Sequence, residues 1–150
     1  MTVNQTGKRT ETLWHQLKES PSVSHYIAEN EAELTVPTFS EVVSEICRTR
    51  GERPEHVIRR AGLERSFGHQ LFKGTRRPSR DTVLQLAFGF EADIELAQLL
   101  LRFAEHSPLY PRNKRDATII YSLFHRHTVM QAQCLLVDIG LRPLGALRDV

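Results

Sequence analysis

The sequence predicts an all-α protein, and three observations support this prediction. Apolar residues recur at helical spacing along most of the chain, whereas the alternating pattern of a strand is almost absent. Prolines and glycines divide the helical pattern into short segments. Residues that favour helix N-termini precede several of these segments. With 150 residues, the chain has the size of one ordinary domain and is large enough to bury a core.

Residues 1–37 are expected to form a short N-terminal helical arm. Two amphipathic segments, residues 12–18 and 23–30, are separated by Ser20 and Pro21. The acidic connector ENEAELTVP then leads out of the arm.

Residues 38–106 are expected to form a five-helix core. Its first helix begins with a capping box, in which Thr38 caps an amide of the helix and Glu41 reciprocates. Gly51 ends this helix, and Pro54 suits the first position of the next one. One face of the first helix is apolar: Phe39, Val42, Val43, Ile46 and Cys47.

Two short helices follow, over residues 55–61 and 64–73. Gly62 ends the first of them and Gly74 ends the second. The loop TRRPS then delivers Ser79 as the cap of the fourth core helix. That helix carries the expected core residues Val83, Leu84, Leu86, Ala87 and Phe90.

The last core helix and a C-terminal hairpin complete the predicted fold. Asp93 caps a strongly apolar helix over residues 94–105, with Leu96, Leu99, Leu100 and Phe103 expected in the core. Residues 107–150 form the extension, in which the linker SPLYPRN precedes helices over 114–126 and 129–139. The apolar face of the first hairpin helix is Ala117, Ile120, Tyr121 and Phe124. Three residues are expected to cap or end the hairpin helices: Asn113, Thr128 and Gly140.

Charge is strongly segregated along the chain. Residues 48–80 hold ten Lys and Arg residues against three acidic ones, although the whole chain has a formal charge of only +2. Residues 1–47 hold three basic and seven acidic side chains, and residues 81–150 hold seven and eight. Such a local basic block predicts contact with a polyanion, because phosphate neutralisation releases counterions. A solvated helical face is the alternative interpretation.

The basic block contains the pattern of a helix-turn-helix, over residues 54–71. In this motif two short helices cross at a turn that usually contains glycine, which Gly62 supplies here. Five residues are expected to face inward: Val57, Ile58, Ala61, Leu63 and Leu71. By the same helical register, four residues are expected to project outward: Arg65, Ser66, His69 and Gln70. They are the candidate base-reading side chains, because Arg and Gln can pair with guanine or adenine edges.

The segment GERPEHVIRRAGLERSFGHQLFKGTRRPS and the following LQLA resemble the XRE family of phage-repressor-like helix-turn-helix proteins. Residues 39–90 match the five-helix layout of that family, and KRDATIIYSL and residues 135–143 resemble a bacterial subgroup with a C-terminal helical extension. The resemblance implies that the second helix of the motif is the recognition helix and that the following loop contacts phosphates. Basic and polar residues cluster around this loop as candidate phosphate ligands: Lys73, Thr75, Arg76, Arg77 and Arg80.

The sequence departs from the family pattern at two positions. Ile58 stands where the family usually has alanine, and Gly68 stands where it usually has a branched apolar residue. We expect these positions to face each other, so that a larger residue in one helix is matched by space in the other. Phe67 and Phe72 are also unusual on a DNA-facing helix. They either pack against neighbouring helices or form an exposed patch for a protein partner.

These features predict a cytoplasmic, homodimeric transcriptional regulator that binds double-stranded DNA. The candidate dimer interfaces are residues 94–105 and 119–139. The alternative is a protein-interaction adaptor that keeps the helix-turn-helix as a scaffold and binds a partner through the phenylalanines or the C-terminal hairpin.

No catalytic pattern, cofactor motif or membrane span is expected. His125 and His127 lie near Cys134 but lack the ligand spacing of a zinc site. Both Cys47 and Cys134 are expected to be small core residues in a reducing compartment.

Overall fold

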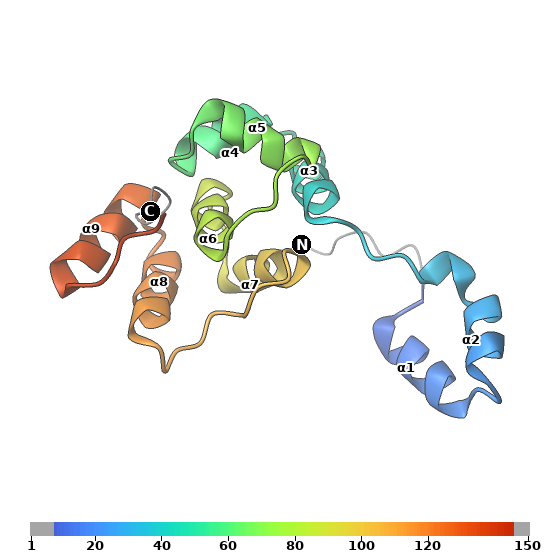
Figure 1. Cartoon of the computed structure of the whole chain (residues 1–150). Helices are drawn as coiled ribbons and strands as arrows, with labels where there is room; N and C mark the ends of the chain where they lie inside the picture. Colours follow the sequence, from blue (N-terminus) through green and yellow to red (C-terminus); the bar gives the residue numbers. More distant parts are fainter. Residues whose placement is uncertain (1–7, 146–150) are drawn as a thin grey trace. The chain divides into compact units, whose positions relative to one another are not determined.

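The computed structural model describes residues 8–145 and divides into two compact units, one that ends at Pro37 and one that begins at Thr38. Figure 1 shows the helices of both units in chain order. Within the described residues all regular structure is helical and no strand occurs, which confirms the all-α prediction.

The N-terminal unit is a small helical hairpin. Helix α1 (Thr10–Glu19) and helix α2 (Val23–Glu29) lie against each other, and a single 3₁₀ turn (Glu31–Glu33) follows. Neither α-helix contains a buried residue, and Trp14 leaves 70% of its surface exposed. In place of an apolar core, hydrogen bonds of the buried Asn30 hold the hairpin together. The Asn30 side chain donates to the carbonyl of Tyr26 and accepts from the ammonium group of Lys8.

The second unit, which we call the helical body, contains seven α-helices in the part of the chain that the structure describes. They are α3 (Phe39–Arg50), α4 (Pro54–Arg60), α5 (Arg65–Lys73), α6 (Arg80–Gly89), α7 (Ile94–Phe103), α8 (Lys114–Phe124) and α9 (Val129–Ile139). Helix α4 packs against α5 and α6, and α3 packs against α5 and α7. Helices α8 and α9 form a hairpin that contacts α7 through α8 and α6 through α9.

The core of the helical body is centred on α6, which is buried from Thr82 to Gly89. The apolar faces predicted for α3 and α6 are buried as expected. Burial also raises the pKa of the Cys47 thiol to about 11, as expected for a cysteine that packs as a core residue. On α7, Leu96 and Leu100 are buried, whereas Leu99 and Phe103 pack against the core while partly exposed.

The predicted helix boundaries have clear local causes. Thr38 and Thr128 each form a capping box with the residue three positions on, and Ser79, Asp93 and Asn113 accept from helix amides. Helices α3, α5 and α9 end at glycines in the left-handed conformation, namely Gly51, Gly74 and Gly140. The caps and glycine stops predicted for these six helices are therefore confirmed.

Two predictions for the C-terminal hairpin are wrong. Tyr121 and Phe124 leave 51% and 70% of their surfaces exposed, while Ile119 and Leu123 of the same helix are buried. Cys134 is exposed, although its neighbours are apolar. Each hairpin helix packs on the body along a single stripe, so a second apolar stripe faces outward.

No helix among the described residues has the length and apolar character needed to cross a membrane.

Candidate nucleic-acid interface

Helices α4 and α5 approach each other closely at one point. A Cβ atom added to Gly68 of α5 would lie 2.3 Å from Cγ2 of Ile58 of α4, which is too short for two carbon atoms. Ile58 is itself buried, so its side chain has little room to move away. This contact confirms the prediction that positions 58 and 68 face each other. The missing side chain at position 68 lets α5 pack directly on Ile58.

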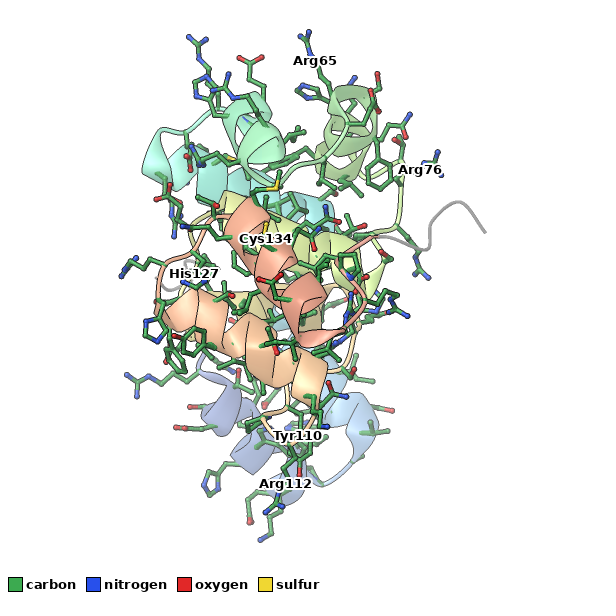
Figure 2. The ribbon with its side chains drawn as sticks, turned by 90° about the vertical axis from the view of Figure 1, so that its left-hand side faces the viewer. Arg65, Arg76, Tyr110, Arg112, His127 and Cys134 are labelled. Carbon is green, nitrogen blue, oxygen red and sulfur yellow. The ribbon has the colours of Figure 1, made fainter. Side chains whose placement is uncertain are left out.

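The outer face of α5, called here the α5 face, carries five polar or basic side chains. They line one shallow hollow: Arg65, Ser66, His69, Gln70 and Lys73. The four predicted base-reading residues are thus brought together on one surface with Lys73. Figure 2 shows Arg65 pointing away from the protein, with Arg76 at the same end of the helical body.

Arg76 connects the loop after α5 to the α5 face. Its Nε donates to Oε1 of Gln70 at 3.0 Å, and its guanidinium lies 5.7 Å from the centre of the Phe67 ring. The backbone amide of Thr75 donates to the carbonyl of Gln70 at 3.1 Å, so the loop starts close against the helix end. Arg77 is exposed beside it. Gln70 is therefore held with its amide nitrogen available as a donor.

Several other arginines of the basic block have structural partners. Arg48 pairs with Glu45, Arg50 donates to the carbonyl of Phe90, and Arg60 pairs with Glu52 and donates to the carbonyl of Gly89. Arg53 lies 3.7 Å from Glu55. The cations of the basic block therefore form two groups, those with an acidic partner and those without one. The α5 face and the loop after it hold most of the second group.

The prediction that Arg80 contacts phosphate needs correction. Its guanidinium forms two hydrogen bonds of 2.9 Å with the carboxylate of Asp116 and also donates to the carbonyls of Ser107 and Pro108. Asp116 is buried, and it also accepts from the backbone amide of Tyr110. Four of the five N–H groups of Arg80 are engaged inside the protein, so this residue anchors the C-terminal extension to the start of α6.

A second, reciprocal pair lies beside the first. Arg115 donates to both oxygens of Asp81 at 2.8 and 3.0 Å, and to the carbonyls of Arg142 and Pro143. We call the Arg80–Asp116 and Arg115–Asp81 pairs the clamp. Burial by itself would raise the pKa of Asp81, but hydrogen bonds from Arg115 and the Gly145 amide outweigh it, and the pKa is lowered.

The lowered pKa of Asp81 predicts a stability contribution that depends on pH. A carboxyl group whose pKa falls on folding stabilises the native state above its unfolded pKa, about 4, and this contribution is lost as the pH falls through the folded value. Chemical unfolding of the wild type and Asp81→Asn should therefore show a large stability difference at pH 6 that shrinks towards pH 3. A difference that stays constant over this range would contradict the prediction.

The N-terminus of α5 is capped by a carboxylate. Glu64 accepts from the backbone amides of Ser66 and Phe67 at 2.9 and 2.8 Å. The hydrogen bonds from Phe67 and Ser66 lower the pKa of Glu64. These amides are therefore already engaged and are not available to a phosphate, in contrast to a free helix N-terminus.

Phe67 and Phe72 are half-buried and pack against the hydrophobic core. The ring of Phe72 lies 6.3 Å from that of Phe90, centre to centre. The packing interpretation of these two residues is favoured over an exposed aromatic patch.

The histidines near the end of α8 form an aromatic cluster. The rings of His125 and His127 lie 4.1 and 5.9 Å from the ring of Tyr121. Among residues 8–145, no group of three or more His, Cys, Asp or Glu residues is placed to hold a metal ion.

Sequence reasoning missed the residues that position the loop after α5. Besides the clamp, Nε2 of His106 lies 2.8 Å from the carbonyl oxygen of Pro78. The Arg–Asp dipeptide occurs at 80–81, 115–116 and 148–149, so its repetition did not identify which arginine pairs with which aspartate. Comparisons of the chain with known protein families, curated proteins and solved structures gave no match.

Proposed function

We propose that this protein is a regulator of transcription that binds double-stranded DNA in the cytoplasm. In this proposal α3–α7 form a repressor-like core of the XRE type, and α4 and α5 are its helix-turn-helix. Helix α5 enters the major groove, and the loop that follows it contacts the phosphate backbone.

The observation that carries this proposal is the distribution of arginine partners. Arg48, Arg50 and Arg60 already have hydrogen-bond or ion-pair partners in the protein, whereas Arg65, Lys73 and Arg77 form no hydrogen bond or ion pair through their side chains within the described residues. Cations without acidic partners on one helix and its adjoining loop suit a surface that neutralises phosphates.

The side chains of the α5 face suit different parts of a DNA site. Arg65 can donate two hydrogen bonds to a guanine edge, and Gln70 has its amide nitrogen available for a base acceptor. Lys73, Arg76 and Arg77 are assigned to phosphates, which carry no sequence information. Because Glu64 occupies the α5 amides, we assign the phosphate contacts to these side chains.

We expect the DNA-bound form to be a homodimer, since one small module reads few base pairs. The α7 residues Leu96 and Leu100 are buried within one chain. The α8–α9 hairpin is therefore the better of the two candidate interfaces, because Phe124 and Val137 expose 70% and 57% of their surfaces there.

The test is selection from a random DNA pool at two salt concentrations, followed by affinity measurements on variants. Arg65→Ala and Gln70→Ala are expected to relax sequence preference, by about 1–3 kcal/mol at the affected base. The double variant Lys73→Ala/Arg77→Ala removes two phosphate ligands that do not contact Gln70, and it is expected to weaken all sequences alike and to reduce the slope of log affinity against log salt by about 2.

A matched control is Arg112→Ala/Lys114→Ala, which removes the same charge from exposed positions elsewhere on the helical body. Its DNA affinity should stay close to that of the wild type. The proposal fails if a variant with Arg65, Gln70, Arg76 and Arg77 all replaced by alanine binds DNA as the wild type does.

The alternative function, a protein-interaction adaptor, is supported by one observation. The α8–α9 hairpin exposes the apolar side chains Tyr121, Phe124, Met130, Val137 and Ile139. An adaptor should show no salt-sensitive DNA binding, and Phe124→Ser/Val137→Ser should release a partner that co-purifies with the wild type.

A further inference from the structure

A groove of about 630 Å³ lies within the helical body, away from the α5 face. Its walls come from the end of α4, the end of α6, and the turn between α8 and α9. His127, which Figure 2 labels, lines this groove. The volume falls within the range of pockets that hold small organic molecules, about 300–1,000 Å³.

The floor of the groove is apolar. Phe88, Ala92 and Leu123 line it and are each at least 95% buried. Val129 and Met130 continue the apolar lining, and Met130 leaves 67% of its surface exposed. A ligand that occupied the groove would therefore remove apolar surface of the protein from water.

The charged groups of the groove are mainly cationic. Arg60 pairs with Glu52 and lies 3.9 Å from Glu91, so these three residues largely compensate one another. Arg59 and Arg126 also line the groove, and both are exposed. The side chains of these two arginines form no hydrogen bond or ion pair with any other described residue.

We propose that this groove binds an amphipathic organic anion, a carboxylate that carries an apolar chain or ring. The carboxylate pairs with Arg59 and Arg126, and the apolar part lies on Leu123, Val129 and Met130. Guanidinium groups form strong, charge-assisted hydrogen bonds with carboxylates, and a neutral or cationic ligand would leave both arginines without a partner. This site does not depend on the proposed binding of DNA.

Binding at this position would join two parts of the fold. Arg59 belongs to α4, whereas Arg126 precedes α9. The two segments already touch nearby, because a Cβ atom on Gly62 would lie 3.4 Å from Cγ1 of Val129. A ligand that contacts both segments only in the folded state is expected to raise the unfolding temperature as its concentration increases.

The experiment uses the full chain and three small probes, namely octanoate, octylammonium and acetate. Binding is measured by ¹H–¹⁵N NMR titration below the concentration at which octanoate forms micelles. Octanoate should bind saturably, with shift changes at the α8–α9 turn and the end of α4. Octylammonium, which has the opposite charge, and acetate, which lacks the chain, should bind at least about tenfold more weakly.

Variants at exposed positions test the two halves of the site separately. Arg59→Gln/Arg126→Gln should weaken octanoate binding by at least about tenfold, and the uncharged substitution Met130→Gln should weaken it by removing apolar contact alone. Arg112→Gln/Lys114→Gln is the matched control and should bind octanoate as the wild type does. Equal binding of octanoate and octylammonium, or unchanged binding by the Arg59/Arg126 variant, would overturn the proposal.

Discussion

Replacing Ile58 with alanine is expected to destabilise the protein by about 2–5 kcal/mol, and adding Gly68→Val to that variant should recover a large part of the loss. Ile58 is buried, and its side chain fills the space that Gly68 leaves open. Alanine at position 58 would leave a cavity beside a glycine, whereas valine at position 68 can occupy that cavity from the opposite helix.

Gly68→Val by itself is expected to destabilise the protein by about 1–3 kcal/mol, because it overpacks the contact between α4 and α5. Even the first carbon of the new side chain would lie 2.3 Å from Cγ2 of Ile58. Two substitutions that are each harmful should therefore partly compensate when combined.

The measurement is a double-mutant cycle, in which urea unfolding gives the free energy of unfolding of each variant. The coupling is the difference between the change caused by the double substitution and the sum of the changes caused by the two single substitutions. Leu100→Ala/Gly68→Val is the control, because Leu100 is a buried α7 residue that is not among the nearest neighbours of Gly68. The losses of unfolding free energy caused by Leu100→Ala and Gly68→Val should add in this control. Additive effects for Ile58→Ala and Gly68→Val as well would show that the two residues do not share one space.

Asp116→Asn is expected to destabilise the protein by about 3 kcal/mol. This value is at the lower end for a broken buried pair, because the Arg80 side chain keeps 25% of its area exposed. The side-chain amide introduced at position 116 cannot accept both hydrogen bonds from Arg80. The substitution also removes the negative charge that compensates the partly buried guanidinium. The cost arises mainly from leaving Arg80 without its counter-charge.

Hydrogen exchange together with chemical unfolding tests this second prediction. The amide of Tyr110 should exchange faster in Asp116→Asn, because it donates to Oδ2 of Asp116 in the wild type and Arg80 also holds the carbonyl of Pro108 nearby. Asp138→Asn, at an exposed position of α9, makes the same chemical change and should alter stability by less than about 0.5 kcal/mol. Equal effects of the two substitutions would show that the clamp contributes little.

The helix boundaries could be predicted from the sequence because they depend on interactions within a few residues. Thr38 reaches the amide of Glu41 in the same turn, and Gly74 adopts a positive φ at the end of α5. The core residues of α3 and α6 could be predicted equally well. Helix α3 buries one apolar face, and α6 is buried along most of its length. The grouping of Arg65 and Gln70 on one side of α5 follows from helical periodicity alone.

Other features depend on neighbours that are distant in sequence. Nothing around Arg80 distinguishes it from Arg76 or Arg77, and only the fold brings Asp116 to it across 36 positions. Tyr121 and Phe124 have the spacing of core residues, but α8 packs through the stripe that contains Ile119 and Leu123.

The helices, their ends and the polar face of α5 follow from the amino-acid sequence, because short-range hydrogen bonds and helical periodicity produce these features. Two further features could be seen only in the folded protein: which arginines remain without acidic partners and which apolar stripes are covered. Those outcomes depend on how helices pack, and a single ion pair such as Arg80–Asp116 changes a residue from a surface cation into an internal anchor.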